Sequence, residues 1–289
     1  MLRILATIFA ALIGLAFGSF LNVCLSRWPQ GESIVHPRSH CRACGRTLTW
    51  WENIPVVSWL ALRGRCRTCG TWISFRYPLV EVSVAAVWAI LVWNSADLLA
   101  IGTEYAPYWL TDVAIGCSLG FLWLLVALAV LDFEHLWLPD FLTLPGIALG
   151  ILVRSVMELA ANHYIEPQIA RKFLWNILGI LAAAAIVLAI RWLYWLIRHR
   201  EGLGLGDAKL LALLAAWLGL PMALLSLFLG VVVAGALTAL ALLLAKPRRA
   251  PGSWAAAKLP LGTFLCIGGI VSALWGQQIL SAYLRWAGF

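Results

Sequence analysis

The sequence predicts an all-α polytopic membrane protein with about eight transmembrane helices and one sizeable loop domain. It is 63% hydrophobic and only 12% charged, whereas soluble domains are roughly 25% charged. Its apolar residues form runs that are long enough, or nearly so, to cross a bilayer. Such runs must be helical, because each has to satisfy its own backbone polar groups in lipid. The expected helices span residues 4–25, 78–94, 110–131, 138–159, 173–195, 207–218, 222–245 and 259–284, of which 207–218 is the shortest.

The basic residues gather on alternate connections between these helices. Eight arginines follow the first helix, four basic residues lie around the connection from the fifth to the sixth, and four lie between the seventh and eighth. Only five of the 21 Lys and Arg residues lie elsewhere. By the positive-inside rule the basic connections face the cytoplasm, so both termini lie outside. The net charge of +8 is therefore a topology signal and needs no nucleic-acid partner.

The first helix has almost no basic residues before it and no small-residue cleavage site, so we interpret it as a retained membrane helix. Its last turns contain Gly18 and Asn22, which favour close helix packing with an interhelical hydrogen bond. A contact between Asn22 and a substrate or cofactor is the alternative. Glu81, at the start of the second helix, either pairs with loop arginines or lines a polar pocket, and the sequence leaves both roles open.

Residues 26–77 form the only sizeable soluble segment of the sequence and contain two pairs of cysteines. Cys41 and Cys44 belong to one C-R-x-C-G unit, and Cys66 and Cys69 belong to a second. Two thiolates separated by two residues reach the same ion, and two such units complete a tetrahedral zinc site. We expect this closed site to be structural, because the loop has too few apolar residues for a core of its own.

Two alternatives to zinc are weaker. Disulfides are disfavoured because the loop faces a reducing compartment. A thioredoxin-like redox site needs one CxxC unit on a strand–helix pattern, which the sequence lacks. The other cysteines, Cys24, Cys117 and Cys266, lie within predicted helices and are expected to be packing residues.

The third predicted helix stops at Asp132. Helix C-termini disfavour anions, so Asp132 is not expected to act as a cap. Glu134 and His135 are expected in a short solvated loop. Asp140 follows Pro139 and suits the positive start of the fourth helix.

Alternating glycines, Gly202, Gly204 and Gly206, come directly before Asp207 and the sixth helix. One interpretation is that Asp207 caps this helix, because glycine-rich turns before helices are common. The topology offers another. The third helix runs inward and the sixth runs outward, so Asp132 and Asp207 lie at the same cytoplasmic boundary. Two facing carboxyl groups that share a proton are the equipment of an aspartic protease.

These motifs carry a family resemblance. Residues 204–207, with Lys209, resemble the GxGD motif of the membrane aspartic proteases. Leu131-Asp132 and 138–140 resemble the partner motif of the prepilin peptidases, also called type IV leader peptidases. The paired cysteine loop is similar to that family's cytoplasmic domain, and the resemblance covers residues from about 18 to 210.

The resemblance implies an enzyme of the bacterial inner membrane that removes the leaders of type IV prepilins and type II secretion pseudopilins on the cytoplasmic side. It implies that Asp132 and Asp207 are the catalytic pair. It also implies that the new N-terminal residue is methylated with S-adenosylmethionine, although no GxGxxG motif follows a strand, so spacing identifies no donor site. We expect Gly204 and Gly206 to leave room for an extended substrate backbone beside the carboxylate.

The expected domains are a first helix at 1–25, a zinc-binding loop at 26–77 and a seven-helix membrane domain at 78–289, with a peptidase core at 110–245. Three other functions compete. They are a peptidase without methyltransferase activity, a zinc-loop scaffold without catalysis, and a transporter that uses intramembrane carboxylates. A transporter should show two repeated halves with interrupted helices, and the sequence contains no such repeat.

Overall fold

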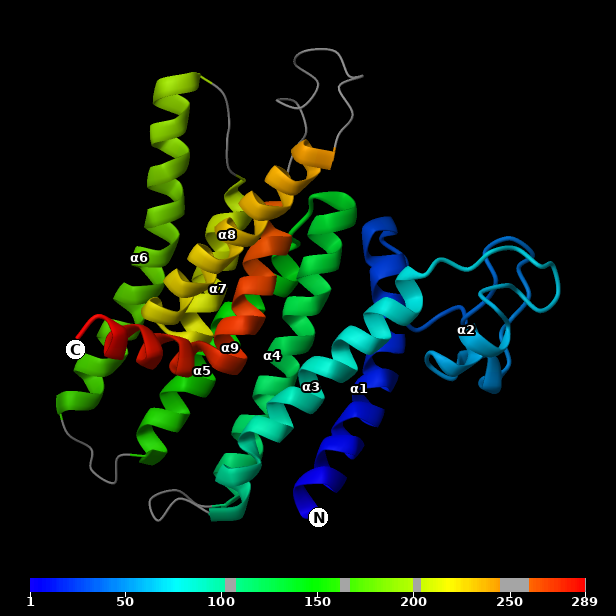
Figure 1. Ribbon diagram of the computed structural model, residues 1–289, viewed down its shortest axis with the longest axis horizontal. Coiled ribbons are helices and arrows are strands. Elements are labelled where there is room, and N and C mark those ends of the chain that lie inside the picture. Colours follow the sequence, from blue (N-terminus) through cyan, green and yellow to red (C-terminus); the bar gives the residue numbers. More distant parts are fainter. Residues whose placement is uncertain (102–107, 162–166, 200–203, 245–259, 289) are drawn as a thin grey trace. The chain divides into compact units, whose positions relative to one another are not determined.

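The computed structural model confirms the all-α prediction. It describes residues 1–101, 108–161, 167–199, 204–244 and 260–288, and within these ranges there are helices and two isolated bridges but no strands. The long helices are α1 (Leu2–Arg27), α3 (Arg76–Ile101), α4 (Tyr108–His135), α5 (Asp140–Ala161), α6 (Pro167–Arg198), α7 (Leu205–Leu218), α8 (Leu220–Leu244) and α9 (Leu261–Trp286), drawn in Figure 1. Three short helices, η1 (Trp28–Gln30), η2 (Trp50–Asn53) and α2 (Val57–Ala61), lie in the cysteine-containing loop.

Each predicted helix corresponds to one of these long helices, with differences at the ends. The prediction that Glu134 and His135 form a loop is wrong, because both lie in the last turn of α4. That helix stops only at Leu136, whose φ of 50° is left-handed and whose N–H still donates to the Asp132 carbonyl. The predicted ends at residues 245 and 259 lie outside the described residues.

Seven of the eight long helices in the described residues are long and apolar enough to cross a membrane, and α7 is the exception. It has 14 residues, which makes it about 21 Å long at 1.5 Å per residue. The hydrocarbon core of a bilayer is about 30 Å thick. The chain is therefore a multi-pass membrane protein in which the helix carrying Asp207 is shorter than a full span.

The chain divides into two compact units, and the first comprises Met1–Ala127. Its two principal helices, α1 and α3, pack closely because glycines remove the side chains between them. A Cβ added at Gly14 would lie 2.8 Å from the Ala85 Cα, and one at Gly18 would lie 2.6 Å from the Glu81 Cα. The predicted interhelical hydrogen bond is also confirmed, because Asn22 Nδ2 donates to the Tyr77 carbonyl at 2.9 Å.

The second unit, Leu128–Phe289, surrounds α7 with other helices. Helices α5, α6, α8 and α9 all contact α7, and the residues from Leu210 to Ala216 are buried. A helix that is apolar all round is either buried in protein or spans a membrane, and the short α7 is enclosed by its neighbours. Trp217, near its end, fits against Gly150 of α5 and donates from Nε1 to the Gly146 carbonyl at 2.9 Å.

These contacts predict that Gly18→Ala destabilises the protein, although alanine is the better helix former. The added methyl would collide with the α3 backbone, and overpacking of this kind costs about 1–3 kcal/mol. Gly116→Ala is the matched control, because a Cβ on that helical glycine meets nothing within 4 Å. The measurement is the free energy of unfolding in detergent micelles. Equal stability of the two variants would contradict the α1–α3 packing.

Candidate active site and metal site

The two C-R-x-C-G units fold into the same small turn. In the first, the Cys41 N–H donates to the Arg46 carbonyl at 2.9 Å and the Gly45 N–H donates to the Cys41 carbonyl at 2.8 Å. In the second, Cys66 and Gly70 make the equivalent bonds, both at 2.9 Å. The glycines have φ values of 70° and 68°, which side chains with a Cβ rarely adopt. The repeat in the sequence thus encodes a repeated turn.

The two turns bring the four predicted cysteine ligands together. The Sγ atoms of Cys41, Cys44, Cys66 and Cys69 all lie within 4.8 Å of one another, and the Cys41 and Cys69 sulfurs are 3.8 Å apart. A tetrahedral ion with metal–sulfur bonds of about 2.3 Å holds its sulfur ligands about 3.8 Å apart. The cluster therefore has the size and the donor set to hold one metal ion.

The environment of this cluster favours at least one thiolate. The Thr71 hydroxyl lies 3.3 Å from Cys69 Sγ, and its hydrogen bond, together with that of the Thr71 backbone, lowers the pKa of Cys69 to about 6. Cysteine binds metals as the thiolate. Cys69 is therefore ready to act as a ligand at neutral pH.

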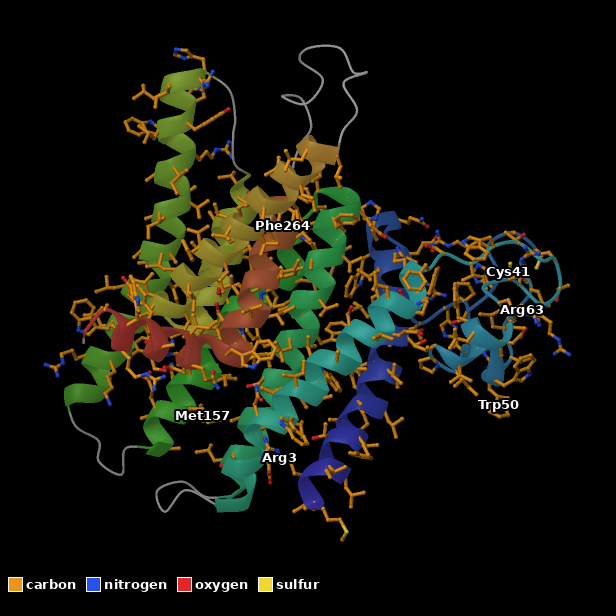
Figure 2. All side chains as sticks on the ribbon, viewed as in Figure 1. Arg3, Cys41, Trp50, Arg63, Met157 and Phe264 are labelled. Carbon is orange, nitrogen blue, oxygen red and sulfur yellow. The ribbon has the colours of Figure 1, made fainter. Side chains whose placement is uncertain are left out.

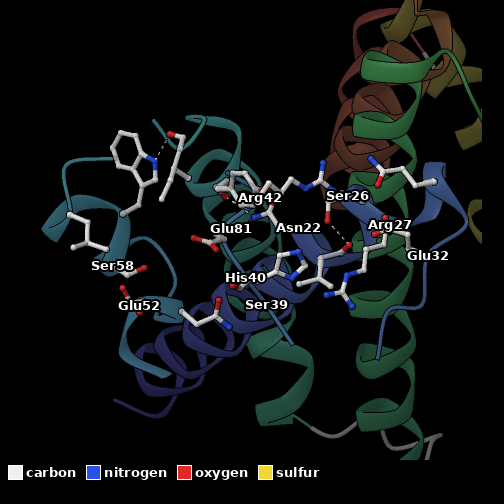
Figure 3. A pocket seen from close by; sticks show the side chains of 18 residues that line it. Asn22, Ser26, Arg27, Glu32, Ser39, His40, Arg42, Glu52, Ser58 and Glu81 are labelled. Carbon is white, nitrogen blue, oxygen red and sulfur yellow. Dashed lines mark hydrogen bonds between the residues drawn. The ribbon is translucent and has the colours of Figure 1, made fainter. Parts of the chain in front are cut away.

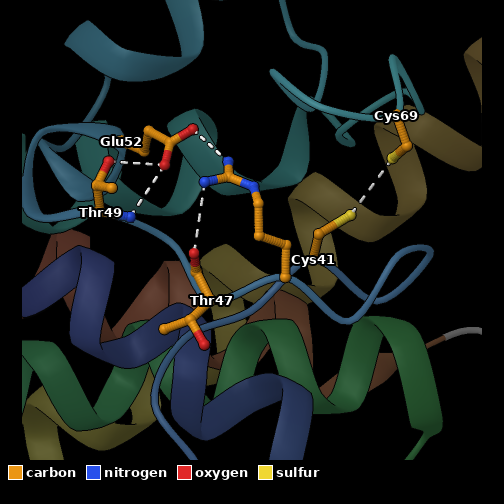
Figure 4. Close-up of polar contacts among 6 residues, drawn as sticks. Cys41, Thr47, Thr49, Glu52 and Cys69 are labelled. Carbon is orange, nitrogen blue, oxygen red and sulfur yellow. Dashed lines mark hydrogen bonds and ion pairs between the residues drawn. The ribbon is translucent and has the colours of Figure 1, made fainter.

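A buried carboxylate braces the loop next to the first cysteine turn (Figure 4). Glu52 accepts hydrogen bonds from the Thr49 N–H at 2.9 Å and the Thr49 hydroxyl at 2.7 Å, and it pairs with Arg46 Nη2 at 2.5 Å. The Thr49–Glu52 contacts form a capping box at the start of η2. The hydrogen bond from Arg46 is the largest of the effects that lower the pKa of Glu52 to about 2.

The two predicted carboxylates both lie in the second unit. Asp132 comes from the last turn of α4 and is 6% exposed, and Asp207 comes from the first turn of α7 and is 8% exposed. The end of α4 and the starts of α7 and α9 lie at the same end of this unit, where the label of Phe264 marks the beginning of α9 (Figures 1 and 2).

Asp132 caps a helix other than its own. Its Oδ2 accepts hydrogen bonds from the Thr263 N–H at 2.7 Å and the Thr263 hydroxyl at 3.2 Å, in the first turn of α9. The backbone of Gly262 also donates to it. The first N–H groups of a helix have no partner within the helix and carry partial positive charge. Asp132 therefore does not cap its own helix, α4, as expected, but it does cap the start of α9.

Asp207 closes the first turn of α7. Its Oδ2 accepts a hydrogen bond from the Gly204 N–H at 3.1 Å. Gly204 is the N-cap and Asp207 is the third residue of the helix, so Asp207 helps to close the first turn from within the helix and is not itself the N-cap. This role does not exclude chemistry, because the same carboxyl group interacts electrostatically with Asp132. The buried thiol of Cys266, three residues after Thr263 in α9, lies near both carboxyl groups. Side chains from α4, α7 and α9 therefore share one neighbourhood.

The glycines of this site permit close approach to Leu138, which lies in the connection between α4 and α5. A Cβ at Gly206 would lie 3.1 Å from Leu138 Cδ1, and one at Gly262 would lie 3.0 Å from the same atom and 2.9 Å from Asp132 Cγ. At Gly204, by contrast, the nearest atom would be Asp207 Oδ2 at an ordinary 3.6 Å. The structure thus gives Gly206 and Gly262 a packing role beside the carboxylates.

An ion pair connects α7, which carries Asp207, with α5, which follows Asp132 in the chain. Lys209 Nζ of α7 lies 2.5 Å from Asp140 Oδ1 of α5. The sequence favoured a structural role for Asp140 at the start of its helix, and the contact adds a partner on α7.

The sequence did not identify Gly262 and Thr263 as residues of the candidate active site. Their only signal in the sequence was a glycine and a hydroxyl residue just after Pro260, at the start of an apolar run.

Comparison with known proteins assigns the two halves of the chain separately. Residues 12–95 match the model of the bacterial peptidase A24 N-terminal domain, and residues 118–240 match the model of the type IV leader peptidase family. The first range contains the cysteine cluster and the second contains both carboxylates. No solved structure matches the chain.

Similar proteins extend over nearly the whole chain. A protein of Stutzerimonas stutzeri is 33% identical over 96% of this chain and 93% of its own length. One from Dichelobacter nodosus is 35% identical over 95% and 93%, and one from Myxococcus xanthus is 38% identical over 86% and 66%. Each of the three is named prepilin leader peptidase/N-methyltransferase.

The contacts of Glu52 with Thr49 and Arg46 predict that Glu52→Gln destabilises the loop, so that trypsin cleaves it faster at neutral pH. Because the pKa of Glu52 falls from 4.5 to about 2 in the fold, its ionised form stabilises the fold above about pH 4.5, and this contribution disappears as the pH falls towards 2. The neutral amide loses it at every pH. The measurement is the cleavage rate at the loop arginines, with Glu32→Gln in the same loop as control. Identical rates would contradict the prediction.

Proposed function

Because the chain belongs to the type IV leader peptidase family, we propose that Asp132 and Asp207 are the catalytic pair with which it removes the leader peptides of type IV prepilins. The chain is a prepilin leader peptidase and N-methyltransferase, as its relatives are. The observation that carries the proposed pair is the placement of two buried carboxyl groups. Asp132 of α4 is bonded to the start of α9, and Asp207 of α7 follows Gly206, which packs on the same Leu138 side chain as Gly262 of α9.

The hydrogen bonds support different roles for the two carboxyl groups. Asp132 accepts two hydrogen bonds from Thr263 and one from the backbone of Gly262, whereas Asp207 accepts one from Gly204. Hydrogen bonds donated to a carboxylate favour its ionised form. We therefore assign Asp132 as the ionised general base and Asp207 as the protonated partner.

With these roles the reaction follows the pattern of a shared-proton carboxyl pair. Asp132 takes a proton from water as the water oxygen attacks the scissile carbonyl carbon, and Asp207 gives its proton to the carbonyl oxygen. When the tetrahedral intermediate collapses, the leaving amine takes a proton from Asp132 and Asp207 recovers its own. Enclosure by α4, α7 and α9 keeps both carboxyl groups out of bulk water.

The glycines before Asp207 are proposed to admit the substrate. Gly204 is exposed and has an extended backbone, and a Cβ there would contact only Asp207 and Gly206, at ordinary distances of 3.6 and 3.8 Å. The fold itself therefore leaves room at this position, and the main chain of a prepilin can lie beside Asp207 without a side chain between them. Gly206 faces Leu138 as well, which limits the free space on that side. Substrate contact is therefore expected to depend more on Gly204 than on Gly206.

The distribution of arginines supports a location in the bacterial inner membrane. With the loop at residues 26–77 and the carboxyl pair on the cytoplasmic side, both termini are periplasmic. A basic prepilin leader would stay in the cytoplasm while its apolar segment lies in the membrane, so the scissile bond would lie at the depth of the pair. Type II secretion pseudopilins share this design and are proposed as further substrates. The peptidase core is proposed to span residues 110–245.

Two further groups complete the proposal. The cysteine cluster fits a structural Zn²⁺, since four cysteine sulfurs would complete a tetrahedral site and leave no position for water. The methyl donor is S-adenosylmethionine. When bound, it would supply the methyl group for the new N-terminal amine, with the sulfur keeping the electron pair of the broken bond and the proton of the amine passing to water.

The catalytic assignment predicts that Asp132→Asn and Asp207→Asn each reduce leader removal by about 10³-fold or more, the usual effect of losing one member of a catalytic unit. The measurement follows a prepilin in membranes by its shift on a gel. Glu134→Gln is the matched control, because this carboxylate lies one residue beyond Phe133 in the same turn of α4 yet is not in the pair. Normal processing by either aspartate variant would refute the assignment.

The zinc assignment predicts about one metal ion per purified chain. Cys41→Ser with Cys44→Ser should reduce the content to near zero, because two ligands cannot retain the ion against a chelator. Elemental analysis measures this directly. Cys117→Ser, a cysteine of α4 outside the cluster, should leave the metal content unchanged. A double variant that still holds one ion would contradict the site.

A further inference from the structure

The first unit contains a polar cavity that the peptidase reaction does not use. It has a volume of 430 Å³ and is lined by the end of α1, the cysteine-containing loop and the start of α3 (Figure 3). Every lining residue falls between Ser19 and Glu81. The cavity therefore lies within the match to the N-terminal domain, residues 12–95, and outside the match to the peptidase family, residues 118–240.

One part of the lining is rich in buried hydrogen-bond acceptors. Glu81 is 6% exposed and accepts a hydrogen bond from the Val56 N–H at 2.7 Å, and Ser19 and Asn22 also hydrogen-bond to its carboxylate. Asn22 is 2% exposed and uses Nδ2 on the Tyr77 carbonyl, while its Oδ1 finds no partner among the described residues. A buried acceptor without a partner is destabilising, so this arrangement favours a ligand that brings a donor or a positive charge.

Another part of the lining carries positive charge. Arg27 donates to the Ser33 and Pro37 carbonyls and Arg42 donates to the Ser26 carbonyl, which fixes both guanidinium groups at the cavity. In Figure 3, Arg27 lies towards the opposite side of the cavity from Glu52 and Ser58. A lining with both signs of charge suits a small zwitterion better than a simple anion or cation.

We propose that this cavity binds S-adenosylmethionine, with Glu81 and Asn22 holding its cationic part and Arg27 and Arg42 holding its carboxylate. The inference rests on the proposed function, which requires a methyl donor. The donor carries an ammonium, a sulfonium, a carboxylate and an adenine ring. The cavity offers acceptors, arginines and the aromatic side chain of Trp59, and its volume falls in the range of about 300–1,000 Å³ usual for small-molecule sites.

This proposal assigns the two activities to different units of the chain. The carboxyl pair lies on α4 and α7, beyond residue 127, and the donor cavity is built from residues 19–81. It also gives the cysteine cluster a role in methylation. The loop that the metal would hold together supplies Arg42, Glu52 and Trp59 to the lining, so loss of the metal would deform the cavity.

The test measures binding of S-adenosylmethionine to the full-length protein in detergent by isothermal titration calorimetry, without prepilin. Glu81→Gln keeps the shape and an acceptor for the Val56 N–H but removes the charge. Hydrogen bonds to charged groups contribute about 1.5–3 kcal/mol, so Kd should rise by about 10-fold or more. Arg42→Gln should weaken binding in the same direction. The matched control, Glu134→Gln, and the peptidase-site variant Asp207→Asn should both bind as the wild type does.

A second measurement does not depend on how the variants fold. Ultraviolet cross-linking of S-adenosylmethionine labelled in its methyl group, followed by proteolysis and mass spectrometry, should place the label between residues 19 and 81. Label between residues 128 and 289, or unchanged affinity in Glu81→Gln and Arg42→Gln, would overturn the proposal. The proposal would also be overturned if Glu81→Gln bound S-adenosylmethionine normally but no longer bound a pilin N-terminal peptide. The cavity would then hold the methyl acceptor. A wild-type protein that cleaves prepilin yet binds no donor would refute this site and leave the peptidase assignment intact.

Discussion

The capture of the Asp132 carboxylate by the start of α9 is the contact on which the candidate active site depends. It joins the end of α4 to a residue 131 positions later in the chain, through hydrogen bonds from Thr263. The unpaired N–H groups of α9 need an acceptor, and the buried carboxylate of α4 needs donors. One contact satisfies both requirements, and it holds the Asp132 carboxylate in one orientation.

The short helix α7 is the second half of this arrangement. Because it is enclosed by α5, α6, α8 and α9, it does not need to span the bilayer by itself. Its first turn is held by the bond from Gly204 to Asp207 and by the ion pair between Lys209 and Asp140. Membrane proteins tolerate irregular backbone and ionised groups where other helices surround them. The burial of α7 thus allows the glycine-rich turn and its aspartate to exist at this position.

The N-terminal unit is held together by a different set of contacts. Glycines let α1 and α3 touch, and the loop between them, with almost no apolar core, is held by two cysteine turns and by the Arg46–Glu52–Thr49 contacts. The space left between loop and helices is polar because Asn22 and Glu81 are buried at its edge. Of the two roles that the sequence left open for Glu81, the structure favours lining a polar pocket.

The sequence by itself determined the all-α class, the position of each long helix and the grouping of the four cysteines in one site. These features follow from local patterns, namely apolar runs and a repeated C-R-x-C-G unit whose glycine adopts positive φ. It also singled out Asp132 and Asp207, since a charge beside an apolar run is conspicuous. Only the tertiary structure decided that α4 extends to His135, that Thr263 and Gly262 donate to Asp132, and that Gly206 packs on Leu138. These contacts join residues far apart in the chain, and hydrogen bonds and close approaches of that kind leave no periodic signal in a single sequence.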